Sequence, residues 1–323
     1  MTKNINWLFP NLFLFEDFTR AVDQFCNDYS INNPLKYVYG IIRCNWAYNY
    51  DSYMKFQEKS FVKNVFSFYG EKNITPILNF SRLTVEKEDL TDSFSNFLLD
   101  LCAEINGEII VASDILFDYI KNKYPELKLI SSVNKPIYKF QKQDKYNAEE
   151  ELKYYCELSE KFDMTVIRPE FIKNIDSISE HKEKFIIPVN SACINNCQYF
   201  DECNNVLNTD FECPKEMSKN PLSANEYYNN LTILTKQQIE KLNDDGFVNF
   251  MLKDNKQYLA FLYPLFIDYL FGDNEKIFVI SDTIREIIRS YWENNEMINL
   301  ILPEIQRQYF NFPIKNLNDF NKA

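Results

Sequence analysis

The segment EIIVASDILFDYIKNKYPELKLISSV (108–133) contains two short apolar runs, EIIVAS and KLISSV, on either side of an amphipathic stretch. Each run is continuous rather than alternating, as in strands buried on both faces of a parallel sheet. Ser113 and Asp114 are suited to cap a helix that begins at Ile115. The segment therefore predicts a strand, a helix and a second, parallel strand.

The same alternation continues along most of the 323 residues. One of the helical patterns, at 235–246, has a capping box at Thr235 and Gln238 and a stop signal at Gly246. Eight strand-and-helix units predict an α/β fold of the (β/α)8 TIM-barrel type, with an open doubly wound sheet as the alternative. The predicted strands cover residues 6–10, 37–43, 75–80, 108–113, 128–133, 164–169, 184–190 and 248–253.

Two stretches lie outside a minimal barrel. Residues 191–234 are too long for an ordinary strand-to-helix connection and contain many Asn and Cys residues, so we expect a functional insertion after the seventh strand. Residues 273–323 are expected to form extra helices, whose apolar spacing suits packing on the barrel or docking of a second subunit. We therefore predict a barrel domain over 1–272, including the Cys-rich loop 191–234, and a helical extension over 273–323.

Composition limits the partners and the compartment. The formal net charge of -12 repels a phosphate backbone, so nucleic acid is not an expected partner. With only five glycines, the chain contains neither of the usual Gly-rich nucleotide-binding motifs. No apolar stretch reaches the length of a membrane span, and we expect a cytoplasmic protein without a membrane partner. Cytoplasmic thiols stay reduced, which favours metal binding or catalysis over disulfides.

Four of the eight cysteines, Cys193, Cys197, Cys203 and Cys213, fall within 21 residues. Thiolates at such short spacing can hold a zinc ion or an iron–sulfur cluster, although the later gaps match neither a zinc finger nor the common ferredoxin motif. The alternative is that these cysteines pack as small apolar residues. Cys44 follows the second predicted strand, so it can reach the same face and replace one of the four.

Polar residues gather after the predicted strands. In a barrel of this type the carboxyl ends of the strands meet on one face, which is the usual active face. Arginine can bind a carboxylate through two parallel hydrogen bonds, so the set suits a small anionic or polyhydroxylated ligand. Simpler roles compete: Ser113 and Asp114 as a helix cap, and Arg168 with Glu170 as a salt bridge. The candidate ligand-binding residues are Arg43, Asn79, Arg82, Asn134, Lys135, Arg168, Glu170 and Asn190, with Lys253 after the last strand.

Over residues 36–270 the chain resembles a divergent branch of the collagenase-like peptidases, the peptidase U-thirty-two family of TIM barrels. The resemblance is carried by EIIVASDILFDYIKNKYPELKLISSVNK, FDMTVIRPE, FIIPVNSACINNCQYFDEC and LTKQQIEKLNDDGFVNFMLKDN. It implies a [4Fe-4S] cluster on Cys193 and Cys197, completed by two of Cys203, Cys213 and Cys44. It also implies oxygen-independent hydroxylation as a possible activity and a related barrel as a possible partner.

The sequence suggests three candidate functions for this protein. The first is an iron–sulfur-dependent enzyme that acts on a small anionic metabolite or a peptide-linked group. The second is a barrel without catalytic activity, in which the cysteines hold structural zinc and the surface binds a protein partner. The third is a peptidase; the single histidine, His181, lies in a charged segment, and no metalloprotease motif is present.

Overall fold

The computed structural model describes residues 5–10, 12–13, 16–47, 59–140, 147–191, 232–253, 259–272 and 277–293. Within it, eight parallel strands close into a barrel in the order β1-β10-β7-β6-β5-β4-β3-β2. The fold is therefore the predicted (β/α)8 barrel, and every predicted strand overlaps an observed one. The strands are β1 (Asn6–Phe9), β2 (Leu35–Gly40), β3 (Thr75–Phe80), β4 (Glu108–Val111), β5 (Leu129–Ser131), β6 (Met164–Val166), β7 (Phe185–Pro188) and β10 (Asn249–Met251).

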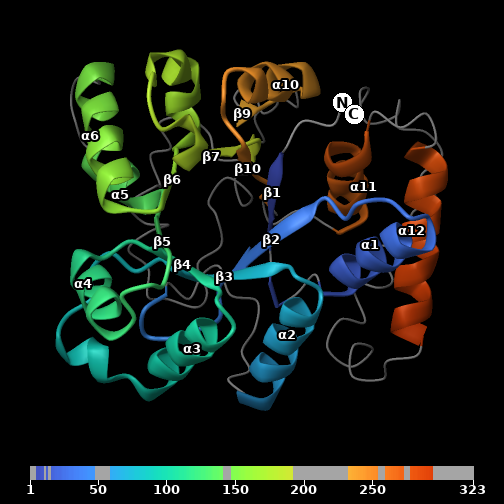
Figure 1. Cartoon of the computed structure of the whole chain (residues 1–323), viewed down its shortest axis with the longest axis horizontal. Helices are drawn as coiled ribbons and strands as arrows, with labels where there is room; N and C mark the ends of the chain where they lie inside the picture. Colours follow the sequence, from blue (N-terminus) through green and yellow to red (C-terminus); the bar gives the residue numbers. More distant parts are fainter. Residues whose placement is uncertain are drawn as a thin grey trace, which may run out of the picture. The chain divides into compact units, whose positions relative to one another are not determined.

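Helices and short 3-10 turns surround the strands of the barrel (Figure 1). The predicted caps are present: Ser113 Oγ accepts a hydrogen bond from Leu116 N at 3.3 Å, Thr235 and Gln238 form the capping box, and Gly246 follows its helix with φ of 106°. The helices are α2 (Lys59–Glu71), α3 (Ser93–Glu104), α4 (Asp114–Lys123), α5 (Asn134–Phe140), α6 (Ala148–Lys161) and α10 (Lys236–Asp244), with 3-10 turns η2 (Glu88–Thr91), η3 (Pro169–Ser177) and η4 (Lys182–Lys184).

Alternate strand residues fill the interior of the barrel, because successive side chains of a strand point to opposite faces. The interior cluster is apolar and draws on every strand, so the barrel has a packed core rather than a channel. Its members are Leu8, Tyr37, Ile77, Ile110, Ile130, Met164, Val166, Ile186 and Met251. Polar residues follow these positions toward the carboxyl ends of the strands.

A small antiparallel hairpin follows β7. Its strands are β8 (Asn190–Ser191) and β9 (Thr232–Ile233), with Asn190 opposite Ile233. Leu234 N also donates to Val189 O at 2.8 Å. The chain therefore leaves the barrel after β7 and returns to the same place before α10, so both ends of the Cys-rich stretch lie at the carboxyl end of β7.

A second compact unit contains described residues 16–34, 259–272 and 277–293, whereas the barrel unit contains the other described residues. It comprises α1 (Glu16–Asp28), α11 (Leu259–Phe271) and α12 (Ile277–Glu293). The Phe18 ring lies 4.6 Å from the Tyr263 ring, and Tyr263 Oη donates to Asp17 Oδ1 at 3.1 Å. Within the predicted extension 273–323, the described residues 277–293 form the helix α12, and the domain boundary at 272 stays a prediction. Among the described helices, none is both long enough and apolar enough to span a bilayer.

Candidate functional site

The carboxyl ends of the barrel strands bring the predicted ligand-binding residues to one face, which we call the rim. The rim residues are Arg43, Asn79, Arg82, Asn134, Lys135, Arg168, Glu170, Asn190 and Lys253. His181 precedes β7 and therefore lies toward the opposite, amino end of the strands. Its side chain is 54% exposed, as expected for a residue in a charged segment. The described contacts show what each rim residue does.

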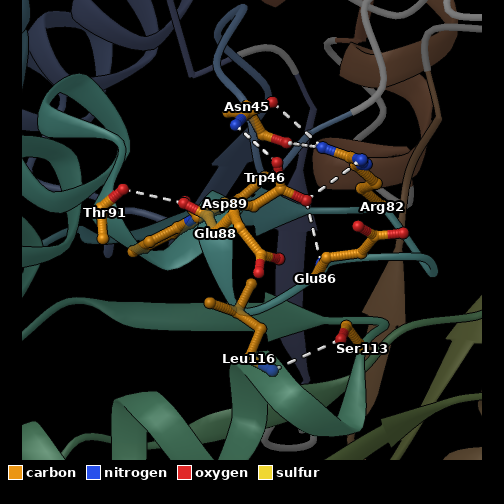
Figure 2. A network of polar contacts seen from close by, with 9 residues as sticks. All are labelled: Asn45, Trp46, Arg82, Glu86, Glu88, Asp89, Thr91, Ser113 and Leu116. Atoms are coloured by element: carbon orange, nitrogen blue, oxygen red, sulfur yellow. Dashed lines mark hydrogen bonds and ion pairs between the residues drawn. The ribbon is translucent and has the colours of Figure 1, made fainter.

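Arg82 is occupied by contacts between two loops of the rim (Figure 2). Its Nη1 donates to Asn45 O at 2.9 Å, and its Nη2 lies 3.1 Å from Asp89 Oδ2. Asp89 also accepts from Asn45 Nδ2 and from Glu86 N, and its backbone oxygen accepts from Trp46 Nε1 at 2.8 Å. The Glu86 N–H and the Arg82 charge lower the pKa of Asp89. Arg82 thus joins the loop after β2 to the loop after β3.

Arg168 is occupied by a buried carboxylate. Its Nε and Nη2 donate to the two carboxylate oxygens of Glu151, at 2.5 and 2.8 Å, and the Glu151 side chain is fully buried. Arg168 N donates to Tyr155 Oη at 2.9 Å. Burial opposes the charge of Arg168, yet the hydrogen bonds and charge of Glu151 raise the pKa of the guanidinium above its ordinary value. The pair fixes the end of β6 to α6.

Lys135 and Asn134 also make internal contacts. Lys135 Nζ donates to Ala112 O at 3.1 Å and to Asp114 Oδ1 at 3.0 Å, and Lys161 shares that carboxylate. Burial raises the pKa of Asp114, but the two ammonium groups outweigh it and the net shift is downward. Asn134 Nδ2 donates to Ser81 O at 3.0 Å. These contacts join the loops after β3, β4 and β5.

Asn190 joins the hairpin to the last strand. Its Nδ2 donates to Lys253 O at 2.8 Å, and its Oδ1 accepts from Lys253 N at 2.7 Å. In this reciprocal pair the side-chain amide both donates and accepts a hydrogen bond. Among the described residues, no carboxylate forms an ion pair with the ammonium group of Lys253. Arg43, in the loop after β2, is exposed.

Two rim acceptors lack hydrogen-bond donors. Asn79 Oδ1 and Glu170 Oε2 are both screened from water, and neither accepts a hydrogen bond. The predicted pair of Arg168 and Glu170 is present only at 3.8 Å, beyond hydrogen-bond distance. An unsatisfied buried acceptor costs about 1–3 kcal/mol, so both oxygens would gain from a hydrogen-bond donor.

The predicted metal ligands Cys193, Cys197, Cys203 and Cys213 lie outside the described residues. Cys44 is described and is 7% exposed. Burial raises the pKa of its thiol to about 11, despite the nearby backbone N–H groups of Trp46 and Ala47 that favour the thiolate. In the described ranges, no group of three or more His, Cys, Asp or Glu side chains is placed to hold a metal ion.

Glu151 and Asp89, the carboxylate partners of Arg168 and Arg82, were not identified from the sequence. Glu151 stands four and seven residues before Tyr155 and Leu158, so the helical period places it on the buried face of α6, which was a usable signal. Asp89 gave no comparable signal, because its contacts come from two loops distant in sequence. Cys26 and Cys102 are buried, whereas Cys156 of α6 is exposed.

No family model and no curated protein matches this sequence. A solved structure of a U32 peptidase, Mk0906, superposes with a TM-score of 0.48 and 11% sequence identity. The superposition covers 79% of this chain and 94% of that peptidase.

Proposed function

We propose that this chain is an iron–sulfur-dependent enzyme of the U-thirty-two-like type, with its substrate at the rim. The observation that carries the proposal is the hairpin of β8 and β9. It anchors both ends of the stretch that contains the cysteines at the carboxyl end of β7, the face where barrel enzymes bind their substrates.

The cluster ligands in this proposal are Cys193 and Cys197, with Cys203 and Cys213 preferred over Cys44. Metal ligation requires a thiolate, and the raised pKa of Cys44 disfavours one. A bound cluster supplies redox or Lewis-acid chemistry, while the protein contributes ligands, burial and substrate orientation. The rim residues described above position the loops around that substrate.

Of the two expected substrate classes, the contacts favour a peptide-linked group over a small anion. Arg82, Lys135 and Arg168 each already contact a carboxylate of the protein, so none of them is held ready for an anionic ligand. The rim acceptors without donors suit a substrate with N–H groups. Oxygen-independent hydroxylation of such a group is the reaction that we propose.

Anaerobic purification tests the proposal. We expect a brown protein with about four irons and four acid-labile sulfides per chain, the content of one [4Fe-4S] cluster. Cys193→Ala should lose most of the iron, whereas Cys156→Ala should keep it, because Cys156 is an exposed cysteine of α6. A colourless protein without stoichiometric iron and sulfide contradicts the proposal.

A second function, a barrel without catalytic activity that holds structural zinc and binds a protein partner, is favoured by one observation. Most polar groups of the rim hold its loops together instead of pointing to a free ligand. Elemental analysis separates the two: zinc that survives anaerobic purification at one per chain supports the second function, and iron with sulfide supports the first.

A further inference from the structure

The charges around Arg168 do not balance. Two carboxylates, Glu151 and Glu170, face one guanidinium, so the group carries a net charge of about -1 when all three are ionised. Glu151 takes two guanidinium donors at hydrogen-bond distance, whereas Glu170 Oε2 stays 3.8 Å from Nη1. The uncompensated charge therefore lies on Glu170, in the first turn of η3 directly after β6.

The Glu170 side chain is partly exposed at the surface of the protein. It is 21% exposed, although Oε2 itself is screened from water and accepts no hydrogen bond. A cationic donor at this position gains both a hydrogen bond and the remaining negative charge, and such charge-assisted bonds are about twice as strong as neutral ones.

Asn79 supplies a second unpaired group on the same face. It pairs with Ile110 in the register of β3 and β4 and follows Ile77 by two positions, so its side chain points into the barrel interior beyond the apolar cluster. Its Oδ1 is buried without a donor. The next interior positions of β4 and β5, between the two acceptors in the strand order, carry the small side chains of Ala112 and Ser132.

We propose that the rim ligand carries an amino group, which Glu170 binds as an ammonium, and a second N–H donor, which hydrogen-bonds to Asn79. The proposal rests on the proposed function in one respect, that the rim is the ligand-binding face. Amines and amide N–H groups occur together at the amino end of a peptide and in amino-acid amides. The ligand is therefore recognised by its donors and its positive charge, rather than by arginines that grip an anion.

Glycinamide, which has an ammonium group and an amide, is the probe for this site. Titration followed by NMR should show binding to the wild-type protein, about tenfold weaker binding to Glu170→Gln, and weaker binding to Asn79→Leu. Glu183→Gln is the matched control, because Glu183 is 63% exposed in η4, before β7. Propionate and propionamide, which lack the ammonium group, should bind more weakly than glycinamide.

Equal affinity of glycinamide for the wild-type protein and Glu170→Gln overturns the proposal, as does tighter binding of propionate than of glycinamide. If Glu170→Gln fails to fold, Asn79→Asp gives an independent result: the added carboxylate should tighten glycinamide binding severalfold, and unchanged or weaker binding in a folded protein overturns the proposal.

The two proposals fail separately. Protein without iron that binds glycinamide through Glu170 contradicts the iron–sulfur function and leaves the amine site standing. Protein with a full cluster whose glycinamide affinity does not depend on Glu170 contradicts the amine site alone. Measuring iron content and glycinamide affinity on the same sample therefore assigns any failure to one proposal.

Discussion

At the residue scale, the ion pair of Arg168 and Glu151 is more deeply buried than the pairs of Arg82 with Asp89 and of Lys135 with Asp114. Glu151→Ala removes both short hydrogen bonds from a guanidinium that is only 8% exposed, while the Glu170 carboxylate stays 3.8 Å away. Such a change typically destabilises a protein by about 3–5 kcal/mol. We expect a loss of that size in the free energy of unfolding, measured in urea.

The matched control is Glu157→Ala, a change at an exposed glutamate of the same helix. Its effect should stay within about 0.5 kcal/mol of the wild type, as for most surface substitutions. Equal effects of the two substitutions would show that the ion pair contributes nothing to stability.

Glu108 gives the barrel a pH-dependent stability. Burial raises the pKa of its carboxyl above the ordinary 4.5, although Lys128 and Lys36 oppose the shift and Asp163 adds to it. Because the folded-state pKa is the higher one, the stabilising contribution is present at low pH and is lost as pH rises through that pKa. Relative to Glu108→Gln, the wild-type protein should therefore lose stability as pH rises from below the ordinary pKa of 4.5 through the higher folded-state pKa.

Urea denaturation at several pH values measures this difference. Glu183→Gln serves as the control, because its exposed carboxyl should show no comparable pH dependence relative to the wild type. A difference between wild type and Glu108→Gln that is constant with pH, or that has the opposite slope, contradicts the prediction.

At the element scale, the strands and the caps could be predicted from sequence because they depend on local patterns, whereas the alternation of strands and helices also allowed an open doubly wound sheet, and the barrel closes through the pairing of β1 with the distant β10. Continuous apolar runs marked the strands, and Ser113, Thr235 and Gly246 marked helix ends. The roles of the rim cations could not be predicted, since the partners of Arg82 and Arg168 come from other loops and helices. A residue's place after a strand indicates which face it reaches, but not whether its charge is already balanced.

The end of β2 packs against the loop after β1 so closely that it requires glycine. A Cβ on Gly40 would lie 2.7 Å from both the N and the Cβ of Leu12, and Leu12 N donates to Tyr39 O at 3.0 Å. Gly40→Ala should therefore reduce stability by about 1–3 kcal/mol, as overpacked sites do. Thermal unfolding measures the change.

Gly70 near the end of α2 is the control, because a Cβ there has no neighbour within 4 Å. Gly70→Ala should be neutral or should stabilise the protein by up to about 1 kcal/mol, through the higher helix propensity of alanine. Destabilisation of both variants by the same amount would show that the close contact with Leu12 is not the cause.

At the scale of the whole molecule, the chain forms two compact units, and the second is built from separated parts of the sequence. Within that unit, α1 follows β1 in the chain but packs with α11 and α12 from the other end of the sequence. Phe18 and Phe25 of α1 lie against Tyr263 and Phe271 of α11. Helix α1 therefore depends on residues more than 200 positions later, which a local pattern cannot reveal.

Because each unit has its own apolar contacts, we expect calorimetry to resolve two unfolding transitions. Ile284→Asp places a charge at a position of α12 that is 0% exposed. It should lower the free energy of unfolding of the helical unit by several kcal/mol, and with it the temperature of that transition, while the temperature of the barrel transition stays the same. Val279→Asp is the control on the same helix, because Val279 is 58% exposed and its substitution should change neither transition appreciably. A single transition that shifts as a whole in Ile284→Asp would show instead that the two units unfold as one cooperative structure.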